Sequence, residues 1–208
     1  MNTRPIAQIL KETYLFSFMN DEELDALTKI SSIAHYDKDA LLFMQGERSE
    51  HLLVLVEGLL SVYKHDDKGN EIIIGFFKPF SLIAEPAILK KLPFPSSAVF
   101  KTEGLMLKIE LEAFEKDFIR NPRISYEIIQ SLINKIQLLQ QNIHMNIGST
   151  AKEKILHFYE QNPALALELK KYEIATLLGM SPETLSRNIK ILLKDNKLEV
   201  SNKAYKLI

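Results

Sequence analysis

The chain has 208 residues, of which 46% are hydrophobic and 25% charged, and its formal net charge is −1 at pH 7. This composition is ordinary for a soluble globular protein, and the length fits one large domain or two small ones. The chain contains no cysteine, which excludes disulfide frameworks, thiolate zinc sites, cysteine-ligated iron–sulfur clusters and cysteine nucleophiles.

The sequence carries no sign of a membrane segment. No apolar signal core follows Met1, and the strongest apolar run, residues 51–63, is interrupted by Glu57 and Gly58. This run is too short and too polar to span a bilayer. We therefore expect a soluble cytoplasmic protein with no membrane partner.

Charge is unevenly distributed along the chain. Residues 150–208 contain ten lysines and arginines against seven acids, a net charge of +3, whereas the remainder carries −4. A mildly basic end on a mildly acidic body is a weak indication of contact with nucleic acid.

The first part of the chain predicts short helices followed by many strands. Residues 6–32 show helical periodicity, and Asn20 is suited to cap a helix whose first turn is acidic. From residue 33 onward, short apolar runs alternate with turn signals, a spacing typical of a small antiparallel barrel or roll. The predicted strands are 34–36, 41–43, 52–56, 59–63, 72–77, 98–100 and 105–109.

A long helix is predicted next. Asn121 can cap it, Pro122 fits its first position, and neither glycine nor a further proline interrupts the pattern up to residue 147. Isoleucine and leucine recur with heptad spacing, which favours a helix that pairs two subunits, with an ordinary core helix as the alternative. The predicted dimer interface comprises Ile129, Leu132, Ile136, Leu139 and Ile143.

Residues 148–150 break the long helix, and Thr150 can cap the helix that follows it. We expect a hinge at this break. The predicted domains are therefore residues 1–120 for the roll with its flanking helices, 121–148 for dimerisation, and 149–208 for the C-terminal domain.

Residues 171–192 have the pattern of a helix, a tight turn and a second helix. Ala175 is small where two helices must cross, and Gly179 can adopt a positive φ in the turn. Ser181 followed by Pro182 is a typical helix start.

The second of these helices is amphipathic, with Leu185, Ile189 and Leu192 on one side and polar residues opposite. Arginine can bind guanine bidentately, glutamate can accept from a cytosine amine, and serine can adapt to either. A surface ion pair between Glu183 and Arg187 is the alternative explanation. The predicted DNA-binding residues of this helix are Ser181, Glu183, Thr184, Ser186, Arg187 and Lys190.

A wing is predicted at the C-terminal end. Residues 198–200 and 204–208 are short apolar segments on either side of a Ser-Asn-Lys turn. Lys197, Lys203 and Lys206 could meet phosphates there, and phosphate contacts supply affinity and register rather than sequence choice.

The order of these parts resembles the CRP/FNR family of bacterial transcription regulators (cyclic AMP receptor protein and fumarate–nitrate reductase regulator) over nearly the whole chain. The segment Glu183-Thr184-Leu185-Ser186-Arg187 is similar to the Glu-x-x-Ser-Arg reading motif of the FNR branch. Further matching segments are Leu15-Phe16-Ser17, Asp21-Glu22-Glu23-Leu24, Leu42-Phe43-Met44-Gln45-Gly46-Glu47, Val56-Glu57-Gly58 and Thr150-Ala151.

The resemblance implies an α+β fold: an N-terminal cyclic-nucleotide-binding-like antiparallel β-roll (jelly roll), a long dimerisation helix and a C-terminal winged helix-turn-helix. It implies that Glu183, Ser186 and Arg187 read base edges of TTGAT-like half-sites in double-stranded DNA, and it makes RNA polymerase a further candidate partner. Pro182 departs from members that use a contacting side chain at this position, which leaves the outer bases open.

The resemblance also locates an effector pocket, and the sequence departs most there. Cyclic-nucleotide-binding members carry a Gly-Glu pair and a later Arg-Ser-Ala triplet, whereas this chain has Ala84-Glu85 and Ser96-Ser97-Ala98. Without the arginine, an anionic phosphate in a semi-buried pocket would lack its charge partner. We therefore expect no response to cyclic AMP, and Glu85 as a purely structural acid is an alternative.

The cofactor and the effector are otherwise open. No iron–sulfur cluster is expected without cysteine, and haem stays open, although none of the five histidines lies in a recognisable haem motif. No catalytic motif is present, so we do not expect an enzyme. The favoured hypothesis is a homodimeric DNA-binding transcription regulator with a pseudo-palindromic site. The alternative is a small-molecule or haem sensor whose helical domain contacts proteins instead of DNA.

Overall fold

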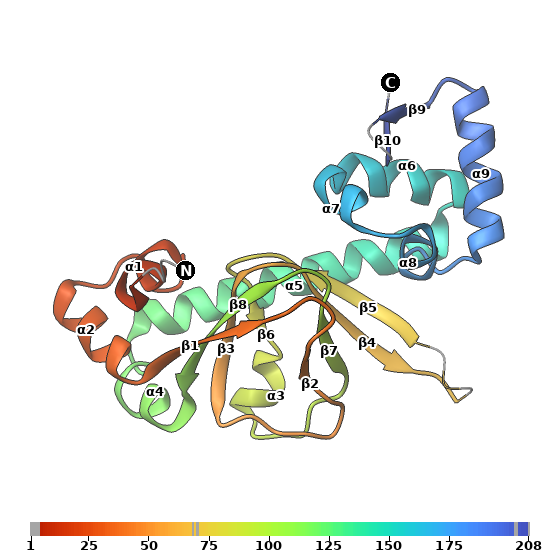
Figure 1. Ribbon diagram of the computed structural model, residues 1–208. Helices are drawn as coiled ribbons and strands as arrows, with labels where there is room; N and C mark the ends of the chain where they lie inside the picture. Colours follow the sequence, from red (N-terminus) through yellow and green to blue (C-terminus); the bar gives the residue numbers. More distant parts are fainter. Residues whose placement is uncertain (1–4, 68, 70, 202–203, 208) are drawn as a thin grey trace. The chain divides into compact units, whose positions relative to one another are not determined.

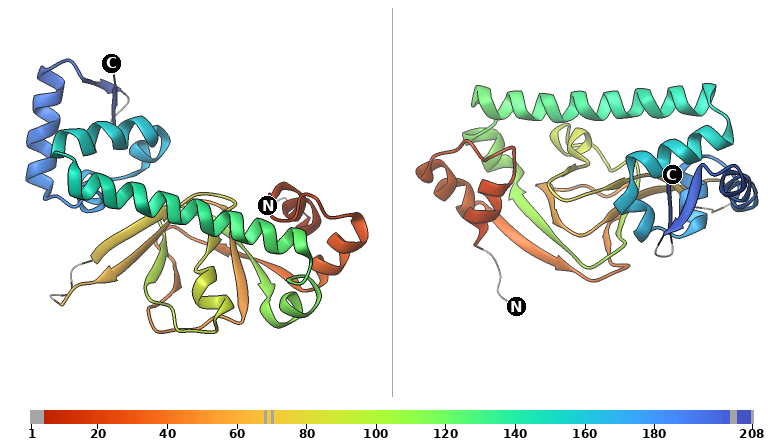
Figure 2. Two further views of the ribbon diagram at one scale, coloured as in Figure 1. Left: turned by 180° about the vertical axis from the view of Figure 1, so that it is seen from behind. Right: turned by 90° about the horizontal axis from the view of Figure 1, so that it is seen from above.

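The computed structural model describes residues 5–67, 69, 71–201 and 204–207, apart from the side chains of residues 138, 141–147, 164, 201 and 204. The chain divides into two compact units, Met1–Asn134 (unit 1) and Lys135–Ile208 (unit 2). The division falls within one continuous helix, α5 (Pro122–Gly148), which Figure 2 shows as uninterrupted.

Unit 1 contains two four-stranded antiparallel sheets that form the predicted roll (Figure 1). One sheet has the strand order β1-β8-β3-β6 and the other β2-β7-β4-β5. The strands are β1 (Ser31–Tyr36), β2 (Leu41–Phe43), β3 (His51–Glu57), β4 (Leu60–His65), β5 (Glu71–Phe77), β6 (Leu82–Ile83), β7 (Ser97–Phe100) and β8 (Gly104–Glu110).

Hydrophobic patterning explains why the roll closes. Every residue from Leu52 to Val56 of β3 is buried, because β3 contributes side chains to two apolar clusters on opposite faces of its sheet. The turn after β3 depends on Gly58, which has φ +93°. A Cβ at this position would lie 2.6 Å from the carbonyl oxygen of Glu103, so only glycine fits without displacing the backbone.

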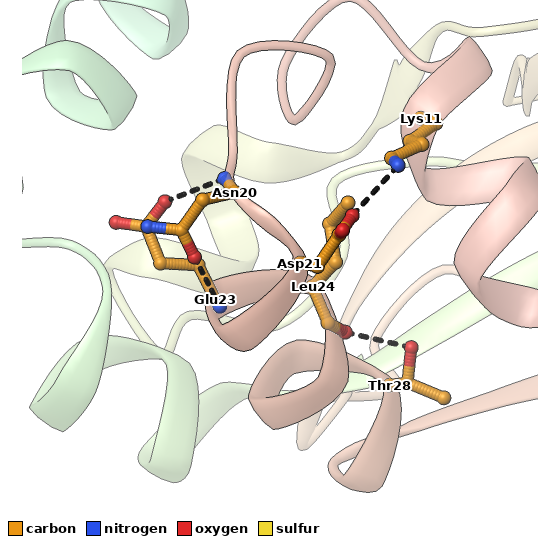
Figure 3. Close-up of polar contacts among 6 residues, drawn as sticks. All are labelled: Lys11, Asn20, Asp21, Glu23, Leu24 and Thr28. Carbon is orange, nitrogen blue, oxygen red and sulfur yellow. Dashed lines mark hydrogen bonds and ion pairs between the residues drawn. The ribbon is translucent and has the colours of Figure 1, made fainter.

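Three short helices lie together at one end of the roll: α1 (Ile6–Glu12), α2 (Asp21–Lys29) and α4 (Leu111–Asp117) (Figure 1). Asn20 caps α2 as predicted, since its side chain accepts from the Glu23 amide at 2.9 Å while the Glu23 carboxylate accepts from the Asn20 amide at 3.0 Å (Figure 3). Lys11 of α1 pairs with Asp21 of α2 at 2.8 Å, which joins the two helices.

The start of α5 follows the prediction. The Arg123 amide donates to the Asn121 side chain at 3.0 Å, and Pro122 is the first residue of the helix. Ile124 and Ile128 are buried against the cluster that also contains Phe114 of α4. This packing fixes the first turns of α5 to unit 1.

The edge strand β5 has an apolar outer surface. β5 is last in its sheet, and Ile72 and Ile74 each keep 48% of their surface exposed. Among the described residues, no helix combines the length and apolar character needed to cross a membrane.

Unit 2 contains the predicted winged helix-turn-helix. Its elements are α6 (Ala151–Gln161), α7 (Pro163–Glu168), α8 (Lys171–Leu177), α9 (Pro182–Lys194), β9 (Leu198–Ser201) and β10 (Ala204–Leu207). Thr150 caps α6 through a reciprocal pair of bonds with Glu153, as the sequence predicted. The short helix α7, which begins at Pro163, is not among the elements that the sequence predicted.

Candidate nucleic-acid interface

The turn between α8 and α9 is built by local backbone chemistry. Gly179 adopts φ +65°, and the Met180 amide then donates to the Ala175 carbonyl at 3.0 Å, which ends α8. Ser181 begins α9, since its hydroxyl accepts the Thr184 amide at 3.2 Å. The predicted roles of Gly179 and Ser181 in the turn are confirmed.

The two faces of α9 separate as the periodicity predicted. Leu185, Ile189 and Leu192 are buried, and α9 packs on α6 and α8. The opposite face is exposed at Glu183, Arg187 and Lys190 and half-buried at Thr184 and Ser186. A helix fixed by its apolar side thus presents a compact polar surface of mixed chemistry.

The acid at the start of this surface is held in its charged form. The Glu183 carboxylate accepts hydrogen bonds from its own backbone amide and from the Ser181 hydroxyl, which keep the pKa of this group below its usual value. Its neighbour Arg187 forms no ion pair with any residue in the described part of the chain. The alternative of a Glu183–Arg187 surface pair therefore does not describe this geometry, and both groups face solvent.

The lysines predicted for the wing lie in different surroundings. Lys206 of β10 lies opposite Glu199 of β9, and the two side chains form an ion pair at 2.7 Å. Lys197 is exposed at the start of the wing. Lys203 lies outside the described residues. Lys206 is therefore neutralised within the wing, while Lys197 is exposed.

The residues predicted for an effector pocket lie in the interior of the roll. Glu85 begins α3 (Glu85–Leu89) and is 1% exposed, and Ala84 before it adopts φ 54°, a conformation that favours glycine. Ser96 and Ser97 are both buried, and the Ser97 hydroxyl accepts the Gln45 amide at 2.9 Å. Ala84 packs against the same apolar cluster that contains Ala98, the neighbour of Ser97.

An aromatic side chain that the sequence reasoning missed fills this part of the roll. The Phe94 ring is buried and stacks on Phe43. Two backbone bonds hold it there, from the Gly46 amide to the Phe94 carbonyl at 2.9 Å and from the Phe94 amide to the Glu47 carbonyl at 2.7 Å. The signal in the sequence is an aromatic residue between Pro93 and Pro95, directly ahead of the serine pair.

Most of the predicted dimer residues form an exposed stripe on α5. Ile129, Ile136 and Leu139 are 52%, 53% and 56% exposed. Leu132 is half-buried against the unit 1 core. The side chain of Ile143 lies outside the described ones. Large apolar side chains left open along one helix are typical of a surface that another chain covers.

Comparison with known proteins finds a matching domain model and relatives of similar length. Residues 33–121 match the family model of the cyclic nucleotide-binding domain. The cAMP-activated global transcriptional regulator CRP of Salmonella typhimurium is 22% identical over 194 residues, which cover 88% of this chain and 92% of that protein. A CRP-like cAMP-activated global transcriptional regulator of Mycobacterium tuberculosis is 22% identical over 191 residues, 86% of this chain and 85% of that protein.

Solved structures share the fold. A mutant of CooA from Carboxydothermus hydrogenoformans superposes with a TM-score of 0.76 at 19% identity, covering 95% of this chain and 93% of that one. The c-di-GMP responsive global regulator CLP of Xanthomonas campestris gives a TM-score of 0.73 at 20% identity, covering 90% and 99%. Residues 33–121 therefore match the cyclic nucleotide-binding domain, and over most of its length the chain is similar in sequence to transcription regulators of the CRP type. Its fold is shared with CooA and CLP.

Proposed function

We propose that this chain is a sequence-specific DNA-binding transcription regulator that works as a homodimer and does not respond to cyclic AMP. The observation that carries the proposal is the exposed polar face of α9, opposite a buried apolar stripe. On this face Arg187, which has no ion-pair partner among the described residues, lies near Glu183, whose charged form is stabilised by hydrogen bonds. In this proposal residues 149–208 read DNA, residues 121–148 pair the subunits and residues 1–120 form the sensor-like roll.

The chemistry of the α9 surface fits the major groove. An unpaired guanidinium can donate bidentately to guanine, and an ionised carboxylate can accept from a cytosine amine. Ser181 and Thr184, at the first turn of α9, and Lys190, on its exposed face, are suited to phosphate contacts that fix register. TTGAT-like half-sites are the first sequences to try, because Glu183, Ser186 and Arg187 match the motif that reads them in related regulators.

The exposed stripe on α5 supports the proposed dimer. A two-fold pair of such helices would cover Ile129, Ile136 and Leu139, which are otherwise half-exposed. Two reading helices related by a two-fold axis require a pseudo-palindromic site with half-sites about one helical turn apart. RNA polymerase is a further candidate partner of a regulator bound at such a site.

The interior of the roll supports the proposal that the chain does not respond to cyclic AMP. No cation stands at Ser96, where a cyclic phosphate would need one, and the segment before it is fixed by the Phe94–Phe43 stack. Desolvating an anion without a charge partner is unfavourable. The relatives from Salmonella and Mycobacterium are named cAMP-activated, so this chain would differ from them in its regulation.

Selection of bound sequences from random double-stranded DNA tests the proposal. We expect enrichment of a pseudo-palindrome whose affinity falls steeply with salt and is unchanged by cyclic AMP. The selection is run with and without added haem, since haem dependence would identify the effector. If the full chain shifts no DNA at low salt, the proposal fails and the sensor with a protein-binding helical domain takes its place.

A further inference from the structure

Two adjacent lysines precede and begin the first helix of the helix-turn-helix, and each stands over an aromatic ring. The Lys170 ammonium lies 5.9 Å from the centre of the Tyr172 ring, and the Lys171 ammonium lies 5.4 Å from the centre of the Tyr205 ring. Both lysines are exposed. Tyr205 belongs to β10, so the second contact joins the wing to α8.

We propose that Lys171 binds a phosphate of the DNA backbone and that Tyr205 is the positioning residue that holds its ammonium group in place. The inference rests on the proposed DNA-binding function and adds a contact to it that the sequence motifs do not indicate.

The charge of Lys171 is available, unlike that of Lys152 and Lys206 in the same unit. Lys152 pairs with Asp195 at 3.5 Å, and Lys206 pairs with Glu199 at 2.7 Å. In the described ranges of the chain, no carboxylate oxygen lies within 4.0 Å of the Lys171 ammonium. Binding to phosphate is driven by release of counterions from DNA, and a lysine that is already neutralised contributes less to it.

The ring beneath Lys171 is itself fixed. Tyr205 meets Tyr159 of α6 edge to face, with ring centres 5.7 Å apart and planes at 82°. Tyr159 is buried, and burial, with a smaller contribution from Tyr205, raises the pKa of its phenol to about 12, so it stays neutral. The contacts of Tyr205 with Tyr159 and with Lys171 therefore connect β10 to α6 and to α8.

A lysine side chain that is already held in position before the ligand arrives binds that ligand more favourably. A free lysine loses considerable rotamer freedom when it meets a ligand, and a ring that already restrains the side chain reduces this loss. The attraction between an ammonium and an aromatic face supplies the restraint without neutralising the charge. An ion pair such as Lys206–Glu199 supplies restraint as well, but at the expense of the charge.

The position in the motif points to phosphate as the ligand. In a helix-turn-helix, the second helix enters the major groove while the first crosses the DNA backbone. Lys171 is the first residue of that first helix. Lysine is a point-charge ligand for phosphate, and such contacts orient the reading helix without adding base preference.

The test measures the affinity of the full chain for its selected site as a function of salt. Lys171→Ala should flatten the plot of log K against log salt by about 0.9 per subunit, the value for one phosphate contact, and should weaken all sequences alike. Lys206→Ala is the matched control, and its slope should equal that of the wild type because Glu199 already neutralises the lysine.

The role of Tyr205 is tested by a double-mutant cycle. Tyr205→Leu should weaken binding about two- to fivefold in the wild-type background, the range expected for one exposed cation–aromatic contact, and should have no effect in Lys171→Ala. Tyr205→Phe keeps the ring and should bind like the wild type. Equal losses in both backgrounds would mean that Tyr205 only supports the wing, which overturns its positioning role.

The outcomes separate this inference from the function on which it rests. An unchanged salt slope in Lys171→Ala, with wild-type base preference intact, overturns the phosphate contact and leaves the DNA-binding function standing. A wild-type chain that binds no DNA at low salt overturns the function itself. Lys171 is exposed, so its replacement is not expected to prevent folding, and the measurement stays decisive even where Tyr205→Leu fails to fold.

Discussion

The ring of Phe94 lies on the ring of Phe43 with centroids 3.9 Å apart and planes 25° apart. The two side chains come from distant parts of the roll sequence, and both belong to the apolar cluster between the sheets. This stack places the chain's own atoms beside the buried pair Ser96 and Ser97, and it makes the interior of the roll part of the protein core.

Phe94→Ala should therefore behave as a core truncation. We expect a loss of about 3–5 kcal/mol in the free energy of unfolding, because the vacated space cannot collapse fully. Urea unfolding followed by circular dichroism measures the loss. Leu92→Ala is the control in the same segment, since Leu92 is 51% exposed and should change stability by no more than about 0.5 kcal/mol. Similar losses in the two variants would contradict a filled roll.

Arg187→Ala should alter DNA recognition without altering the fold. Removing a bidentate contact to guanine costs about 1–3 kcal/mol on the selected site and relaxes the preference at one base pair of each half-site. Binding to a set of single-base variants measures both effects. Lys194→Ala, at the exposed last turn of α9, should leave the base preference intact. An Arg187→Ala protein with the wild-type preference would rule out Arg187 as a base-reading residue.

Ile136→Glu should separate the subunits. A carboxylate in the centre of a two-fold apolar interface has no partner, and burying it should weaken the dimer by about 3 kcal/mol or more. Sedimentation velocity over a range of concentrations measures the shift toward monomer, and affinity for the palindromic site should fall with it. Gln137→Glu adds the same charge at the neighbouring exposed position and should leave the dimer intact; equal effects would point to net charge as the cause.

Glu153 should make the stability of unit 2 depend on pH in the acid range. Its pKa lies below the ordinary value of 4.5 because the backbone amide and the hydroxyl of Thr150 donate to it. A carboxyl with a lowered folded pKa stabilises the fold above its ordinary pKa, and this stabilisation is lost as the pH falls through the folded value.

The urea midpoint of the wild type should consequently fall more steeply on acidification than that of Glu153→Gln, whose amide does not titrate. Glu160→Gln removes an exposed acid from the same helix, α6, and should keep the wild-type pH profile. Parallel profiles for all three proteins would show that the bonds from Thr150 have no effect on the titration.

Local rules made much of unit 2 predictable. Thr150 and Ser181 start helices because short polar side chains satisfy free amides at helix ends, a property that neighbouring residues alone determine. Gly179 and the periodic burial of Leu185, Ile189 and Leu192 are likewise encoded within a few residues. For the roll, turn spacing and the family resemblance predicted the class of fold, but they did not give the order of the strands in each sheet.

Contacts between residues far apart in the sequence could not be predicted from local sequence patterns. The pairing of Lys206 with Glu199 depends on the register of a hairpin, and the contact of Lys171 with Tyr205 depends on how β10 packs on the helices. The place of Phe94 depends on backbone bonds to a turn nearly fifty residues earlier. These three contacts determine which lysine charges stay free for a ligand and how much room is left inside the roll. Such properties can therefore differ between proteins that share the same sequence motifs.

The outer edge of the roll has a practical consequence. β5 is the last strand of its sheet, and the exposed side chains of Ile72 and Ile74 make that edge apolar. An exposed edge strand can pair with a strand of another molecule. Concentrated solutions of the protein should therefore aggregate through pairing at β5. Ile74→Lys would place a charge on this edge and oppose the pairing. Samples of this variant for crystallisation or NMR should stay clear at a higher protein concentration than the wild type.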